Sequence, residues 1–139
     1  MIHNDDKHYV IMFIIMILSG LFSTMNMWVD KLDDVRFSIN DVYMTLLMTG
    51  WMFLFMGIVD KYPRVIFIGV SLIVGTIWCI RTQFMVSEAQ YKLGMIPHHS
   101  MAIHMSKRLL DKKNNIQSFL NHIIYTQEKE ISFMKQSTV

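Results

Sequence analysis

The sequence has few of the residues that interrupt helices, with 6 glycines and 2 prolines among 139 residues. Hydrophobic residues make up 53% of it, and a soluble domain of that composition would need more turns. The one cysteine, Cys79, lies in an apolar run and has no partner for an intrachain disulfide, so it says nothing about redox compartment. The shortage of helix breakers and the surplus of apolar residues predict an all-α membrane protein.

Charge runs and catalytic signatures are scarce as well. The formal net charge is +2 with no long basic run, so we expect no nucleic-acid partner. We find no Ser/His/Asp order, no glycine-rich phosphate loop, no reactive-thiol context and no pair of acids suited to general acid–base chemistry. The sequence therefore predicts a protein that is not an enzyme and has no evident small-molecule substrate.

Three apolar runs are long enough to cross a lipid bilayer. They cover about residues 9–29, 42–59 and 65–84. A span needs roughly 20 apolar residues, and Arg81 in the third run can extend its charged end to the interface. We expect a three-helix transmembrane region over residues 1–86 of a multi-pass integral membrane protein. A cleaved signal peptide is the alternative for the first run, but that run is too long and its leader is acidic as well as basic.

Small residues and loop charges predict how the spans pack and how they are oriented. Thr45 with Thr49, and Ser71 with Gly75, have the spacing that lets membrane helices approach closely. The link after the second run carries two cations, whereas the loop after the first run carries more acids than bases. The positive-inside rule then places the N-terminus in the cytoplasm and the C-terminal tail on the extracytoplasmic side, although Arg81 and Lys92 favour the opposite orientation.

The tail, residues 87–139, is amphipathic rather than uniformly apolar. Ser87 and Gln90 have the spacing of a capping box, which opens a helix. We expect that helix to end in the polar turn at residues 111–115, and a second helix to run to about residue 136 with Asn115 as its N-cap. Two helices joined by a short turn form an antiparallel hairpin. A lone hairpin buries little, so we expect it to pack on the spans or on a second copy, giving a homo-oligomer with a four-helix bundle.

The stretch from Tyr91 to Leu110 concentrates histidine and methionine around Pro97. On a helix, adjacent histidines point about 100° apart, so His98 and His99 share an ion only if a kink at Pro97 turns them together. Imidazole nitrogen and thioether sulfur are ligands that copper prefers. The metal ligands that we consider are His98, His99, Met95, Met101, His104, Met105 and Met134. In the alternative interpretation His98 is a core residue, His99 and His104 face solvent, and the methionines fill space.

A second methionine pattern lies in the middle apolar run. Met44, Met48, Met52 and Met56 recur every four residues and form a stripe on one helix face. Such a stripe could pass Cu(I) by ligand exchange. Methionine is also an ordinary packing residue in lipid, and no polar partner accompanies the stripe, so packing is the simpler interpretation.

The segments "MIPHHSMAIHM" and "IIYTQEKEISFMK" resemble the bacterial family catalogued as domain of unknown function 305. The matching positions are Met95, Ile96, His98, His99, Ala102, Met105, Gln127, Glu130, Ile131 and Met134. The remainder is similar to a membrane-bound subgroup with three N-terminal transmembrane helices. The resemblance implies a ferritin-like bundle for the tail, and copper binding as in some periplasmic members. This chain has fewer Met and His repeats than those members, which argues against high-capacity copper storage.

Two functions are compatible with these features. The first is a membrane-anchored helical module that binds copper or another transition metal through His and Met residues. The second is a non-catalytic structural or assembly protein of a membrane, in which the hairpin mediates oligomerisation without metal. The two are not exclusive, because a metal can lie at a subunit interface.

Overall fold

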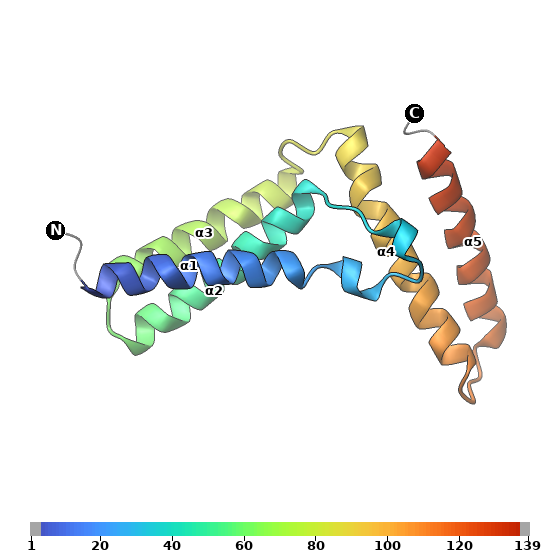
Figure 1. Ribbon diagram of the computed structural model, residues 1–139, viewed down its shortest axis with the longest axis horizontal. Helices are drawn as coiled ribbons and strands as arrows, with labels where there is room; N and C mark the ends of the chain where they lie inside the picture. Colours follow the sequence, from blue (N-terminus) through green and yellow to red (C-terminus); the bar gives the residue numbers. More distant parts are fainter. Residues whose placement is uncertain (1–3, 137–139) are drawn as a thin grey trace. The chain divides into compact units, whose positions relative to one another are not determined.

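The computed structural model describes residues 4–136, with side chains from residue 7 onward. Every regular element in this range is helical, in agreement with the all-α prediction. The chain forms two compact units, one from residues 1–23 and 39–85, the other from residues 24–38 and 86–139 (Figure 1). We describe each unit by itself.

The first unit contains three long apolar helices. They are α1 (Asn4–Phe22), α2 (Ile39–Val59) and α3 (Pro63–Thr82). Segments at 7–28, 39–59 and 63–82 are long and apolar enough to cross a membrane by length and composition. α3 begins with Pro63 at its first turn, where a missing N–H is tolerated. It ends at Thr82, and the next residue, Gln83, takes the left-handed conformation that stops a helix.

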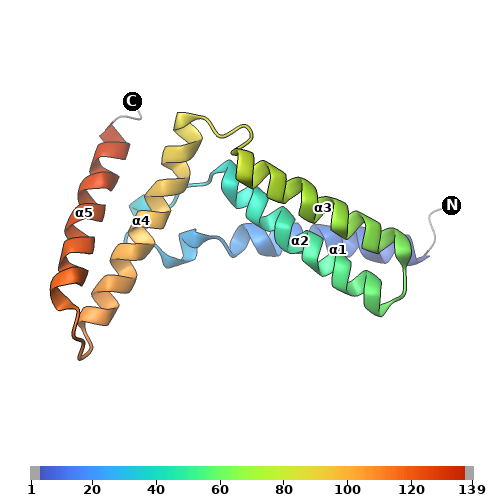
Figure 2. The same cartoon turned by 180° about the vertical axis from the view of Figure 1, so that it is seen from behind.

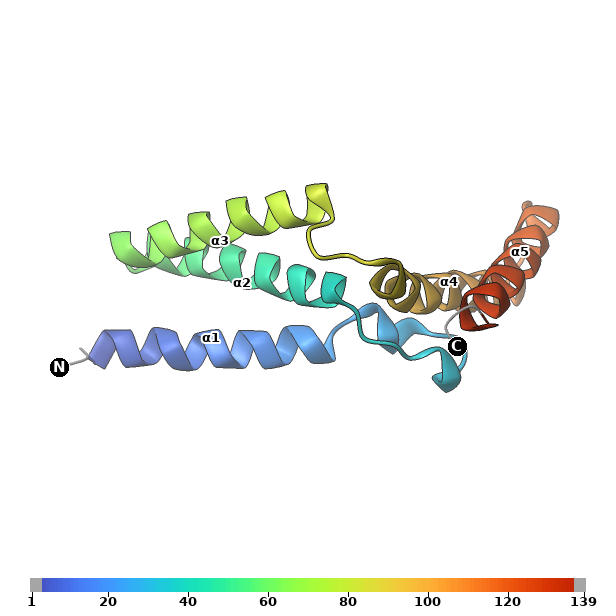
Figure 3. The ribbon, with the colours of Figure 1, turned by 90° about the horizontal axis from the view of Figure 1, so that it is seen from above.

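The α2 and α3 helices lie side by side because glycine lets their backbones touch (Figure 3). A Cβ at Gly69 would lie 2.5 Å from the backbone nitrogen of Leu54, and one at Gly57 would lie 2.7 Å from that of Ile66. Thr45 and Thr49 are buried as the spacing predicted, and each hydroxyl donates to the carbonyl four residues earlier. The other small pair, Ser71 and Gly75, is exposed instead.

The first helix ends earlier than the apolar run predicted. α1 stops at Phe22, and Thr24 takes an extended conformation with φ −78° and ψ 173°. Asn26 explains part of this ending, since its side-chain oxygen accepts from the Arg36 backbone N–H and its amide donates to the Arg36 carbonyl. These two bonds join residues 26 and 36 of a loop that includes two short 3-10 turns, Met25–Trp28 at its start and Leu32–Asp34.

The methionine stripe predicted on α2 is largely outward-facing. Met44 and Met48 are 53% and 44% exposed, and Met52 and Met56 are half-buried. The stripe thus lies beside the α2–α3 contact, and the described residues do not enclose it in a channel.

The second unit is built on an antiparallel hairpin of α4 (Glu88–Leu110) and α5 (Gln117–Gln136) (Figure 2). The Ser87 side chain accepts from the Gln90 backbone N–H, as the capping box predicted. At the turn, Asn114 rather than Asn115 makes the side-chain bonds: it accepts from the Ile116 N–H and donates to the Leu109 carbonyl. Asn114 therefore ties the end of one helix to the start of the next.

The hairpin's small core is completed by the segment of residues 24–38. The apolar contact between α4 and α5 comes from Ile96, Ile103, Ile131 and Met134, with Met95 and Ile124 beside them. The sequence predicted a boundary at residue 86, with everything before it in the transmembrane region. Residues 24–38 pack against α4 instead, because their acidic side chains meet cations and a hydroxyl of the hairpin.

Candidate functional site

The adjacent histidines of α4 have different neighbours. His99 is buried, and its Nδ1 makes no hydrogen bond but lies 3.0 Å from Oε2 of Glu130 on α5, a contact that becomes an ion pair when the imidazole is protonated. His98 is exposed, and its Nδ1 lies 3.4 Å from the sulfur of Met25. The ring centroids are 6.1 Å apart. α4 continues through Pro97 with the two rings directed to separate surroundings.

The burial of the two histidines is the reverse of what the interpretation without a metal predicted. That interpretation placed His98 in the core and His99 in solvent. Pro97, His99, Ser100 and Ile103 all lie on the buried face of α4. His99 falls on this face because it is three residues after Ile96, which is 2% exposed, and residues three apart share a helix face.

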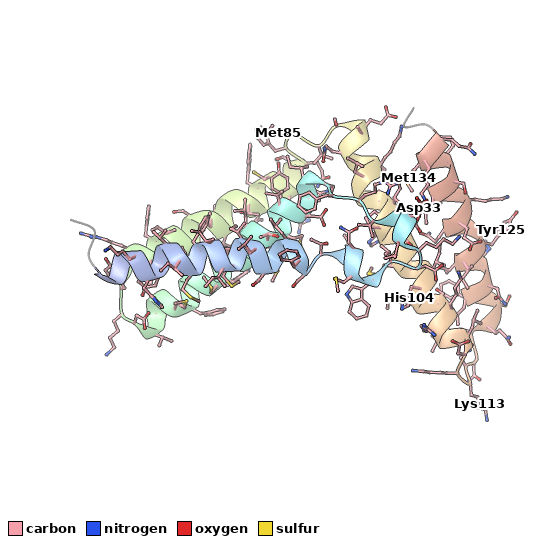
Figure 4. The ribbon with its side chains drawn as sticks, viewed as in Figure 1. Asp33, Met85, His104, Lys113, Tyr125 and Met134 are labelled. Carbon is pink, nitrogen blue, oxygen red and sulfur yellow. The ribbon has the colours of Figure 1, made fainter. Side chains whose placement is uncertain are left out.

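His99 opens into a pocket of about 610 Å³ between α4 and α5. Met95 from α4 and Met134 and Glu130 from α5 line the same pocket. Figure 4 shows Met134 on the side of α5 that faces α4, with Tyr125 on the opposite side. The remaining lining residues are Tyr91, Lys129 and Phe133. The pocket thus offers one imidazole, two thioethers and one carboxylate.

The electrostatics of the pocket favour a neutral imidazole. Burial lowers the pKa of His99 below its ordinary value of 6.5, and the neighbouring His98 lowers it further. The Glu130 carboxylate raises the pKa, but by less than burial lowers it. A neutral ring keeps a nitrogen lone pair available, which is the form that binds a metal ion.

The other candidate ligands do not line this pocket. Met101 and His104 are half-buried, and Met105 is 55% exposed. Among residues 4–136, no group of three or more His, Cys, Asp or Glu side chains is close enough to hold a metal ion. Of the seven predicted ligands, the structure gathers three, His99, Met95 and Met134.

A buried carboxylate lies on another side of α4. Asp34 is 3% exposed, accepts from the Ser100 hydroxyl at 2.6 Å, and pairs with the Lys135 ammonium at 2.7 Å. Ser100 in turn accepts from the Asp30 backbone N–H at 2.9 Å. One loop side chain therefore joins both helices of the hairpin.

Two partly exposed ion pairs lie beside this carboxylate. Lys107 Nζ lies 2.7 Å from Asp30, and Asp33 pairs with Lys135. The hydrogen bond from Lys135 lowers the pKa of Asp33. Burial lowers the pKa of Lys135, but the bonds to Asp33 and Asp34 outweigh burial and raise it overall. We call Asp30, Asp33, Asp34, Ser100, Lys107 and Lys135 the loop–hairpin network.

Sequence reasoning did not single out this network. It also did not name Met25, the neighbour of His98, or Glu130, which lines the pocket, as ligands. The available signal was charge complementarity, since the loop after the first apolar run is acidic and the hairpin carries a surplus of Lys and Arg. Ser100 was a second signal. A serine in mid-helix with no role in a cap is often bonded to another element.

Comparison with known proteins agrees with the motif. A family profile described as Domain of unknown function (DUF305) matches residues 82–138. An uncharacterized protein of Acanthamoeba polyphaga mimivirus is 39% identical, with 94% of this chain and 90% of the viral protein covered. No solved structure matches the chain.

Proposed function

The chain belongs to the DUF305 family, and from that premise we propose that it is a membrane-anchored, non-catalytic helical module that binds a soft transition metal ion, copper in first place, between α4 and α5. The observation that carries the proposal is the buried Nδ1 of His99, which makes no hydrogen bond, has the Glu130 carboxylate 3.0 Å away and lies in a pocket with two thioethers. Buried polar nitrogens are nearly always satisfied, so an unsatisfied one calls for an explanation. A metal ion supplies one.

The donor set favours copper over harder ions. Thioether sulfur selects Cu(I), and imidazole accepts either oxidation state. His99, Met95 and Met134 are the three ligands, and Glu130 contributes a negative charge beside them. The lowered pKa of His99 means that protons compete with the metal only at more acidic pH.

Copper content of the full-length protein tests the assignment. We expect one copper per chain in wild type by elemental analysis, and loss of it in His99→Ala and in the double variant Met95→Leu, Met134→Leu. The matched controls are His104→Ala on the same helix and the exposed Met105→Leu, which should keep the metal. Equal copper in wild type and His99→Ala contradicts the proposal. If His98→Ala loses copper and His99→Ala keeps it, the metal site lies instead at His98 and its neighbour Met25.

We place the three apolar helices across a bilayer, with the N-terminus in the cytoplasm and the second unit on the extracytoplasmic side. The support is chain topology: if α2 and α3 both cross, residues 24–38 and the hairpin emerge on the same side, and these two segments pack into one unit. Lys61 in the α2–α3 link and Arg64 in the first turn of α3 favour the cytoplasm.

Labelling of single cysteines in intact cells tests this orientation. In a Cys79→Ser background, an impermeant thiol reagent should label Lys113→Cys, in the α4–α5 turn, and leave Lys61→Cys unlabelled. Labelling of Lys61→Cys and not of Lys113→Cys would show that the protein has the opposite orientation in the membrane. Release of the protein from membranes by alkaline carbonate contradicts the anchoring itself.

An assembly role is the second candidate function, and exposed aromatic residues on α5 favour it. Phe119 and Phe133 are 58% and 70% exposed and lie within about 40° on the helix. A second copy packed there would complete a four-helix bundle. Crosslinking in membranes should then trap dimers that a Phe119→Ser, Phe133→Ser variant loses, and an unchanged yield in that variant argues against the role.

A further inference from the structure

An apolar groove of about 330 Å³ lies in the first unit, outside the metal pocket. Its walls come from the N-terminal half of α1, the middle of α2 and the start of α3. The residues that line the groove include Tyr9, Val10, Phe13, Phe53, Tyr62 and Arg64. The volume is at the low end of the roughly 300–1,000 Å³ of ligand pockets, which suits one flexible chain better than a folded partner.

The groove exists because α1 contacts α2 closely at one end only. Near the C-terminal end of α1, a Cβ at Gly20 would lie 2.5 Å from the Thr45 side chain. Toward the other end, aromatic rings hold the helices apart: Phe13 and Phe53 centroids are 6.0 Å apart, and Tyr9 stacks on Tyr62 at 5.6 Å. The result is a wedge that widens toward the N-terminus of α1.

The wide end of the groove carries an exposed cation. Arg64, in the first turn of α3, lines the groove, and its side chain is exposed. Asp60 lies just before this turn, and its carboxylate accepts from the Tyr9 hydroxyl at 2.6 Å. Among the described residues that line the groove, Arg64 is the charged one, so a guanidinium lies at the mouth of an apolar groove.

We propose that this groove binds a single anionic phospholipid, with one acyl chain between α1 and α3 and the phosphate at the Arg64 guanidinium. The inference rests on the membrane placement proposed above, because only then does the groove lie at acyl-chain depth and Arg64 at the headgroup level. Basic residues at a membrane surface attract anionic lipids, and guanidinium matches phosphate with paired hydrogen bonds. Tyr9 and Tyr62 occupy the interfacial position where tyrosine is enriched in membrane proteins.

Native mass spectrometry of the full-length protein released from detergent micelles tests this, with added phosphatidylglycerol as the probe. Wild type should carry one lipid. Arg64→Gln should lower the bound fraction by about tenfold, in line with losing a charged hydrogen bond, and Val10→Trp should abolish binding by filling the groove. The matched controls are Arg81→Gln, with the same charge change at the other end of α3, and Val74→Phe on its exposed surface.

Each other outcome overturns the proposal. Equal lipid retention in Arg64→Gln and Arg81→Gln, or retention in Val10→Trp, shows that the groove is not the site. Binding of soluble glycerol phosphate with the same affinity shows an anion site without an acyl chain, and release as lipid-free dimers shows that a second copy occupies the groove. If carbonate extracts the protein, membrane placement fails; if the protein stays in the membrane without a lipid, only this inference fails.

Discussion

Backbone contact holds the α2–α3 pair together, whereas polar side chains hold the second unit together. In the pair, Gly69 brings α3 so close that a Cβ would lie 2.5 Å from the Leu54 nitrogen. In the second unit the most enclosed polar tie is the buried carboxylate of Asp34, bonded to Ser100 on α4 and Lys135 on α5. The difference matches the solvents proposed for them. In lipid, helices gain little from burying apolar groups and associate by close packing; in water, a two-helix hairpin lacks a sufficient core and needs further ties.

The largest effect is expected from removing the buried carboxylate. Asp34→Ala leaves the Ser100 hydroxyl without its acceptor and leaves Lys135 with the exposed Asp33 carboxylate in place of two carboxylates. Breaking a buried pair costs about 3–5 kcal/mol, and the remaining Asp33–Lys135 pair puts this variant at the lower end of that range. Hydrogen exchange should quicken throughout residues 24–38 and the end of α5. Asp33→Ala is the control, because its side chain is 81% exposed, and it should change exchange little. Equal exchange in both variants would mean that the network does not hold the loop.

The next effect concerns the helix pair. Gly69→Ala forces a methyl group against the backbone of Leu54 and should destabilise the first unit by about 1–3 kcal/mol. Gly75→Ala on the same helix has nothing within 4 Å and should be neutral or slightly stabilising, since alanine favours a helix over glycine. Denaturant unfolding of both variants in detergent micelles measures the difference. If both variants unfold like wild type, the close α2–α3 contact is absent in solution.

The pH dependence of the second unit distinguishes His99 from the loop–hairpin network. Burial lowers the pKa of His99 in the folded state, so the unfolded chain takes up its proton first, near 6.5. Stability contributed by neutral His99 is therefore full above that pH and falls as the pH drops through it, by at most about 1.4 kcal/mol per pH unit. Thermal unfolding of metal-free protein between pH 8 and 5 should show this slope in wild type. His99→Gln should lose it, and an unchanged slope would assign the proton to another group.

Much of the fold could be predicted from local sequence. Apolar length gave the three helices, and the Ser87–Gln90 spacing gave the start of α4, because these signals act within one turn or one segment. The early end of α1 could not be predicted, because the bonds from Asn26 to Arg36, which help to hold the chain beyond Phe22 in another conformation, depend on the fold of the whole loop.

The candidate site was only partly predictable for a related reason. Residue type pointed to His99, Met95 and Met134, and the structure gathers these three in one pocket. Which of two adjacent histidines is buried depends on where α5 packs, and a helical projection of α4 alone does not contain that information. The bond from Ser100 to Asp34 joins residues 66 positions apart, beyond the reach of any motif.

The smallest effect is expected from the partly buried Lys107–Asp30 pair of the network. Lys107 is 41% exposed and Asp30 14% exposed, with 2.7 Å between them, so water screens the ion pair from the lysine side. Lys107→Met keeps the aliphatic stem and removes the charge, which should cost about 0.2–1 kcal/mol and raise exchange only near residue 30. Adding 1 M salt should erase most of this difference between wild type and variant, because salt screens exposed charges far more than the buried Asp34–Lys135 pair. If Lys107→Met lowers the free energy of unfolding as much as Asp34→Ala does, the buried contact is no stronger than the partly exposed one. The loop would then be held by its overall charge attraction to the hairpin rather than by the enclosed Asp34 carboxylate.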